Sequence, residues 1–226
     1  MFLRAVPLLL CLLALPAHAQ DWQHITSEDG IAVTAREVQG RGFPTFRGVG
    51  VIDASLWEIL AVLSDVGRHR DWMFRCLEAR QLRKISEMEY IVYSRTDAPW
   101  PVSDRDAVFH STVHPSLKDL TIDVRFRAVQ SPLMGPVKGV VRMTKLQGYY
   151  RLKSLGPEKT LMDYQVDADP GGMLPGWLAK LATRRLPIDT IRSLRKRVKV
   201  TRGWYTERIK RWQALEQELR QKKKKP

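Results

Sequence analysis

One short segment of this sequence, residues 98–109 (APWPVSDRDAVF), contains the residue types of a reaction centre. Asp104 and Asp106 lie on either side of Arg105, and a tryptophan between two prolines precedes them. Two neighbouring carboxyl groups can act as general acid and general base when their pKa values differ. An arginine between them favours local ion pairing instead, so we expect a rigid corner rather than a catalytic loop. The residues assigned to this corner fix the backbone or bond to one another: Pro99, Pro101, Ser103, Asp104, Arg105 and Asp106.

Other patterns typical of catalysis or metal binding are incomplete. His69 begins an HRD triplet like that of a kinase catalytic loop, but the chain has no asparagine and no glycine-rich phosphate loop. His110 and His114 are four residues apart in an expected strand, where that spacing corresponds to about 13 Å. The patterns HExxH, CxxC and GxSxG do not occur in the sequence. We therefore expect no enzyme activity, no metal site and no cofactor.

The first 19 residues have the organisation of a secretory signal peptide. Arg4 precedes an apolar stretch at residues 5–15, and the small-x-small sequence Ala-His-Ala ends at Ala19. The stretch is shorter than the roughly 20 apolar residues of a transmembrane helix. We expect cleavage after Ala19 and export, to a periplasm or out of the cell. Cys76 would then be the one remaining cysteine, which excludes a disulfide within the chain.

The chain is strongly basic, with a formal net charge of +14. In a cytosolic protein this charge would indicate nucleic acid, but export removes that partner. We expect instead a peripheral contact with anionic lipid head groups, and no nucleic acid. The alternative is that the charge serves solubility alone. The cations expected to contact the membrane lie near the C-terminus: Arg184, Arg185, Arg192, Lys196 and Lys199.

Hydrophobic periodicity predicts two strands, a helix, six strands and a long C-terminal helix. The expected strands are residues 31–38, 46–52, 78–85, 89–96, 106–114, 121–129, 139–154 and 160–169. Asp53 or Ser55 is expected to cap the central helix, which ends near Gly67. The C-terminal helical region begins at residue 173, and Pro187 lies there at a first turn or a kink. Strands followed by a helix indicate an α+β protein, with the helix laid across a curved antiparallel sheet.

Two sequence blocks resemble one protein family. WPVSDRDAVF (100–109) resembles the W-P-x-S-x-R-D signature of the START family, the lipid-transfer domains related to the steroidogenic acute regulatory protein. GGMLPGWLAKLATRRLPIDTIRSLRKRV (171–198) is similar to the C-terminal lid helix of that family. The resemblance implies a helix-grip fold, a curved sheet wrapped around the long helix with an internal hydrophobic cavity for one lipid or sterol. This sequence departs from the family at Asp104, where family members often have asparagine, and in the helical extension after Gly203.

The resemblance implies a carrier or sensor of one apolar ligand at a membrane surface. We expect a signal peptide at 1–19, a START-like domain at 20–215 and a basic, disordered tail at 216–226, in a monomer. The residues expected to contact the lipid are aromatic, apolar or cationic: Tyr93, Trp100, Arg125, Met134, Met143, Tyr149, Tyr164, Leu174, Trp177, Leu178 and Leu181.

Two other functions fit the same sequence. A helix-grip enzyme, such as a cyclase or hydrolase, would place a titratable group beside the ligand. The residues to inspect for that role are Asp163, Asp167, Arg125 and His110. A ligand-free interaction module would instead dock a partner through the amphipathic segment at 204–219. A cavity well under about 300 Å³ would favour the module over both other functions.

Overall fold

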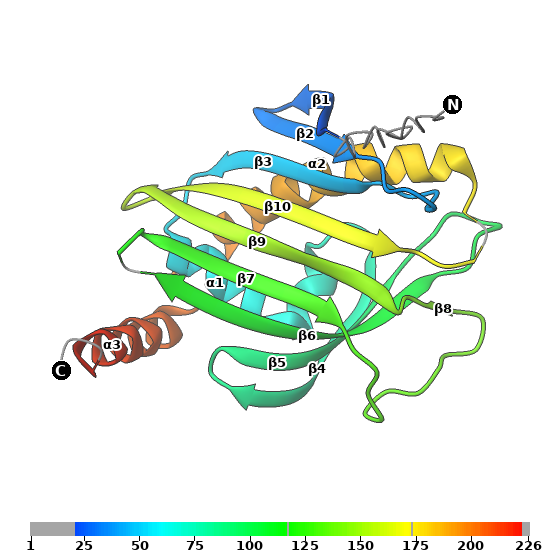
Figure 1. Ribbon diagram of the computed structural model, residues 1–226. Coiled ribbons are helices and arrows are strands. Elements are labelled where there is room, and N and C mark those ends of the chain that lie inside the picture. The colour runs from blue at the N-terminus through cyan, green and yellow to red at the C-terminus, as the bar shows by residue number, and fades with distance from the viewer. Residues whose placement is uncertain (1–20, 117, 173, 223–226) are drawn as a thin grey trace, which may run out of the picture.

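The computed structural model describes residues 21–116, 118–172 and 174–222. The expected signal peptide and the last four residues lie outside the described residues. One strongly curved antiparallel sheet holds a long helix against its concave side (Figure 1). The strand order is β1-β2-β3-β10-β9-β7-β6-β5-β4, and the short β8 pairs in parallel with β6. This arrangement is the helix-grip fold, which confirms the predicted architecture.

The elements follow one another in chain order. The strands are β1 (Gln23–Glu28), β2 (Ile31–Arg36), β3 (Thr45–Ile52), β4 (Cys76–Ser86), β5 (Glu89–Thr96), β6 (Arg105–Ser116), β7 (Thr121–Ala128), β8 (Val141–Arg142), β9 (Lys145–Gly156) and β10 (Lys159–Asp169). The helices are α1 (Leu56–Ser64), the 3-10 helix η1 (Val66–Asp71), α2 (Gly176–Val200) and α3 (Thr206–Lys222).

The first helix has a complete N-terminal cap. The Ser55 side chain accepts a hydrogen bond from the Glu58 backbone N–H at 3.2 Å, and Glu58 accepts one from the Ser55 N–H at 3.0 Å. This reciprocal pair satisfies two backbone donors that the helix itself leaves free. Ser55 is therefore the cap of the two that the sequence suggested, and α1 begins at Leu56.

The long helix crosses the concave side of the sheet at a glycine. A Cβ atom placed on Gly48 of β3 would lie 2.6 Å from the Cβ of Pro187. The absence of a side chain at Gly48 therefore allows α2 to lie directly on the strand. Pro187 is buried inside one continuous α2 and does not divide it.

Several element boundaries differ from the sequence-based prediction. β1 was not predicted, because only Ile25 gives QHITSE an apolar character. The single strand expected at 139–154 is divided into β8 and β9. Helix α3 continues to Lys222, past residue 216, where the disordered tail was expected to begin. Within the described residues, no helix has the length and apolar character required to cross a membrane.

Candidate functional site

A cavity of about 470 Å³ lies between the concave side of the sheet and α2. This volume falls within the range of small-molecule pockets and above the value that would favour a ligand-free module. The lining is mostly apolar and includes aromatic rings from the central strands, among them Phe109, Phe126 and Tyr150. Leu178 of α2 closes the cavity from the opposite side. The enclosed space is therefore suited to a largely apolar ligand.

Strand alternation decides which side chains reach the cavity. Along β6, Ala107, Phe109, Ser111 and Val113 line it, whereas His110 points to the outer face. Successive residues of a strand face opposite sides of the sheet, so a shift of one residue would exchange the two sets. The cavity wall is thus a direct consequence of the register of the central strands.

The cavity reaches the surface beside the first turns of α2. Leu181 lines it although 44% of that residue is exposed, and Leu174 is partly exposed as well. Pro99 and Pro170, from two loops at the same end of the sheet, also belong to the lining. We call the surface around Pro99, Pro170, Leu174 and Leu181 the mouth.

Arg105 is a buried cation at the inner side of this mouth. It lines the cavity and is 7% exposed. Its guanidinium donates to backbone carbonyls only weakly at Pro170 (3.4 Å) and Gly171 (3.3 Å), and more closely at Ser103. Among the described residues, no carboxylate oxygen lies within ion-pair distance of it. Burial lowers the pKa of Arg105, but an arginine stays protonated in proteins, so the cavity contains one uncompensated positive charge.

The other arginines of the lining have acidic partners. Arg185 of α2 donates two hydrogen bonds to Asp189, at 3.0 and 3.1 Å. Arg75 pairs with Asp97 at 2.6 Å. Asp189 also accepts a hydrogen bond from Arg192, at 3.0 Å. These charges compensate one another, which distinguishes them from Arg105.

His69 and the two tyrosines of the cavity are neutral at ordinary pH. Burial lowers the pKa of His69 to about 4, and its Nε2 lies 2.9 Å from the Leu63 carbonyl oxygen. Tyr150 and Tyr164 stack with ring centroids 4.6 Å apart, and burial raises the pKa of Tyr164 to about 12. The hydroxyl and imidazole groups therefore add hydrogen-bonding capacity without adding charge.

The corner at residues 98–106 is built differently from the prediction. Asp104 accepts hydrogen bonds from Arg95 (2.9 Å) and from the Ala98 backbone N–H (3.2 Å). Asp106 is 1% exposed and forms a two-bond pair with Arg142, at 2.6 and 3.0 Å. The prediction that the charges of the DRD triplet bond to one another was wrong. Asp104 pairs with Arg95 of β5 and Asp106 with Arg142 of β8, which leaves Arg105 without an acidic partner at the cavity.

Five of the residues expected to contact a lipid line the cavity: Met143, Tyr164, Leu174, Leu178 and Leu181. Arg105 and Pro99, assigned to the corner by sequence, line it as well. The sequence-based choice missed Phe109, Phe126 and Tyr150. The alternation of β6 and β7 could have identified the first two, because Phe109 and Phe126 face the same side of their strands as the buried residues two positions earlier.

The other expected contacts lie elsewhere, so their placement in the cavity wall was wrong. Trp100 is 91% exposed and Trp177 is 55% exposed. Tyr93 is buried under Arg80 on the outer face, with the guanidinium 5.3 Å from the ring centroid. These and the remaining three are not part of the lining: Tyr93, Trp100, Arg125, Met134, Tyr149 and Trp177.

The alternation of side chains along the strands also places the candidate catalytic groups outside the cavity. Asp163 pairs with Arg47 at 2.6 Å, and Asp167 pairs with Arg41 at 2.6 Å. His110 lies 2.7 Å from Glu89. Arg125 is exposed and binds Asp123. All of the groups named for an enzyme thus lie outside the cavity lining, and a reaction there would have to use other residues.

The cations expected to contact the membrane are spread along α2. Arg185 and Arg192 are engaged in ion pairs, whereas Arg184, Lys196 and Lys199 are exposed. The helix rises about 1.5 Å per residue, so Arg184 and Lys199 are roughly 22 Å apart along its axis. Arg184 and Lys199 therefore lie in opposite halves of α2, and the contact of these cations with a membrane stays a prediction.

A curved sheet that grips a helix over an apolar cavity defines a class of cavity-containing domains. The START domain family model matches residues 12–202 of the chain. This protein belongs to the START family. The match ends before α3.

Individual relatives agree with this assignment. The chain is 35% identical over 179 residues to the uncharacterized protein PA1579 of Pseudomonas aeruginosa, covering 79% of this chain and 87% of that protein. It is 23% identical over 171 residues to the phosphatidylcholine transfer protein of Mus musculus, covering 73% and 77%. A STAR-related lipid transfer protein fragment from Xanthomonas axonopodis superposes with a TM-score of 0.71 at 32% identity, covering 79% of this chain and 98% of that fragment.

Proposed function

We propose that the protein binds one lipid in the cavity, leaves it chemically unchanged and exchanges it with an anionic membrane at the mouth. The observation that carries this proposal is an apolar cavity of about 470 Å³ with one uncompensated buried cation, Arg105. The names of two relatives, a phosphatidylcholine transfer protein and a STAR-related lipid transfer protein, support the same function.

The apolar lining supplies the affinity. Moving a methylene group from water into such a cavity contributes about 0.8 kcal/mol. Ten methylene groups would thus contribute roughly 8 kcal/mol, which corresponds to micromolar affinity before the entropic costs of binding. The rings of Phe109, Phe126 and Tyr150 lie where an acyl chain would pass.

Arg105 selects the polar part of the ligand. A buried guanidinium favours an anionic partner and can bind phosphate or carboxylate through two parallel hydrogen bonds. Its weak bonds to the Pro170 and Gly171 carbonyls leave donor capacity directed at the cavity. We expect a lipid with a phosphate or carboxylate in its head group, and a sterol to bind more weakly.

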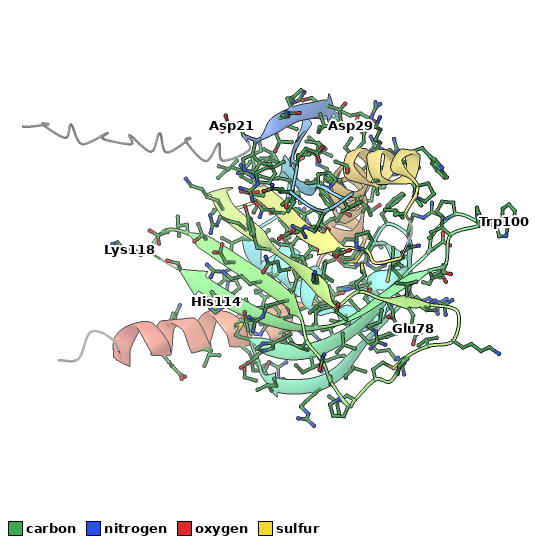
Figure 2. The ribbon with its side chains drawn as sticks, turned by 45° about the vertical axis from the view of Figure 1, so that its right-hand side comes forward. Asp21, Asp29, Glu78, Trp100, His114 and Lys118 are labelled. Carbon is green, nitrogen blue, oxygen red and sulfur yellow. The ribbon has the colours of Figure 1, made fainter. Side chains whose placement is uncertain are left out.

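The mouth has the surface of a membrane-contact site. Trp100 projects away from the body of the protein at this end of the sheet (Figure 2). Trp177 and Leu181 of α2 are also exposed, and Lys180 and Arg184 on the same helix are exposed cations. Tryptophan side chains favour the interface between head groups and acyl chains, and lysine or arginine adds attraction to anionic lipids. With the expected signal peptide, this membrane would face a periplasm or the cell exterior.

Native mass spectrometry of the purified protein tests this function. We expect one lipid per protein, with a phosphate or carboxylate head group. Arg105→Gln should shift the retained lipids away from anionic head groups, whereas Arg127→Gln on the exposed outer face of β7 should not. Thermal unfolding of both variants separates lost selectivity from lost folding. A protein that is empty after mild purification, and that takes up no added phospholipid, would contradict the proposal.

A further inference from the structure

The end of the molecule opposite the mouth has its own basic and apolar surface. Lys118 is exposed in the turn that connects β6 to β7, and Lys153 and Lys159 are exposed at the ends of β9 and β10 beside the turn that connects them. Leu120 is 53% and Leu155 is 49% exposed beside them. The two turns are adjacent, since the Ser154 N–H donates to the Leu120 carbonyl at 2.9 Å. We call these five residues the rear surface.

Helix α3 adds to the charge at the same end. Arg202, in the turn after α2, lies 3.5 Å from Glu158 in the turn after β9, which connects the start of the C-terminal extension to the rear surface. From there α3 extends beyond the sheet (Figure 1). Among the side chains of α3 that the structure describes, Arg208, Lys210 and Arg211 are cationic, and Glu207 and Glu218 are anionic.

The rear surface and the mouth face in opposite directions. Figure 2 shows Trp100 and Lys118 on opposite sides of the molecule. Helix α2 runs between the two ends, and its 25 residues span about 37 Å. Electrostatic attraction is screened within about 8 Å at physiological salt. A flat bilayer in contact with the mouth therefore cannot also attract the rear surface.

We infer that the rear surface binds a second anionic bilayer, so that one protein bridges two membranes while its cavity opens toward one of them. Charge complementarity selects the partner, because the three exposed lysines outnumber the two exposed acids of the same turns, Asp119 and Glu158. The lysines attract anionic head groups, and the exposed leucines insert at the head-group boundary. The inference rests on the proposed membrane contact of the mouth. It adds that lipid exchange takes place between apposed membranes held together by the protein itself.

Vesicle clustering tests the inference with the full mature chain. The probe is vesicles of phosphatidylcholine and phosphatidylglycerol in equal parts, with clustering followed by light scattering and binding by co-sedimentation. We expect the protein to bind and cluster these vesicles, to leave pure phosphatidylcholine vesicles dispersed, and to release the clusters at high salt. Binding without clustering would overturn the inference.

Two sets of variants assign clustering to the two ends. The double variant Lys153→Ala, Lys159→Ala removes two charges from the rear surface and should lower clustering about tenfold. The matched control Arg125→Ala, Arg127→Ala removes two exposed charges from the outer sheet face and should cluster vesicles normally. The variant Trp100→Ala, Trp177→Ala should still bind vesicles through the rear surface but should not cluster them. Normal clustering by the rear variant would contradict the inference. That result would mean that vesicles are joined in another way, for example by two protein copies that bind each other through other surfaces.

Lipid retention separates this inference from the proposed function. The rear variant should retain the same bound lipid as the unaltered protein in native mass spectrometry, because its substitutions lie outside the cavity lining. Clustering by a protein that holds no lipid would contradict the proposed function and leave the bridge standing. A lipid-loaded protein that does not cluster vesicles would contradict the bridge and leave the proposed function standing.

Discussion

The two faces of the central strands carry charge in opposite ways. On the outer face, Arg151 and Asp123 form two hydrogen bonds at 2.8 and 2.9 Å, and similar pairs connect the neighbouring strands. On the concave face, Arg105 has no carboxylate partner among the described residues and lies against apolar side chains. A compensated charge serves the fold, whereas an uncompensated buried charge is available to a ligand. The sequence shows arginines on both faces, and only the pairing distinguishes their roles.

The buried pair beneath the outer face should show the largest effect. Arg142→Ala leaves Asp106 as an unpaired carboxylate that is 1% exposed. Loss of one partner from a buried ion pair costs about 3 kcal/mol or more. Urea denaturation should show that decrease in the free energy of unfolding. A decrease under about 1 kcal/mol would mean that water reaches Asp106 and that this pair resembles an exposed one.

Acid should weaken the fold through His69, at the cavity side. Its pKa is lowered to about 4 in the folded protein, from an ordinary value of 6.5. The unfolded chain therefore binds a proton between these values that the folded protein does not, so stability falls as the pH drops through this window. We expect a loss of about 2 kcal/mol between roughly pH 7 and pH 5. Comparison of urea midpoints with His69→Gln, in which this contribution is absent, isolates the histidine from the other titrating groups.

Filling the cavity should affect ligand binding more than folding. Ser111→Trp places a large side chain into the lining from β6, whereas Thr112→Trp, one residue later, faces outward. Displacement of two methylene groups from the cavity would weaken lipid binding about tenfold. Titration with a fluorescent phospholipid measures this difference. Equal affinities for the two variants would place the lipid outside the cavity.

The smallest effect is expected from an exposed pair of the outer face. Arg151→Ala removes one partner of Asp123, which keeps its bond to Arg125 at 3.2 Å. Exposed or half-exposed ion pairs contribute about 0.2–1 kcal/mol. Thermal unfolding should show a change within this range, and lipid binding should stay unchanged. A loss of lipid binding would show that the two faces are coupled through the strand.

The sequence predicted those parts of the cavity that depend on residues close together in the chain, and it missed those that depend on distant contacts. The lid helix was anticipated because Leu174, Leu178 and Leu181 repeat at helical spacing, and all three line the cavity. Trp100 was misplaced because a tryptophan between two prolines is compatible with burial or with full exposure. Arg105 was assigned to its neighbours in sequence, whereas Pro170 and Gly171, two of the carbonyls it faces, are about 65 residues away. No local pattern reports such a pairing.

The sequence by itself determined most of the order of elements, the two candidate caps of α1, the alternation of the strands and the family signature, because each depends on residues close together in the chain. The tertiary structure decided which face of the sheet is concave, and therefore which alternate side chains of each strand can contact a ligand. It also decided which charges are compensated and that the basic residues divide between two opposite ends. These properties depend on how the sheet curves around α2, since that curvature brings distant segments together or separates them.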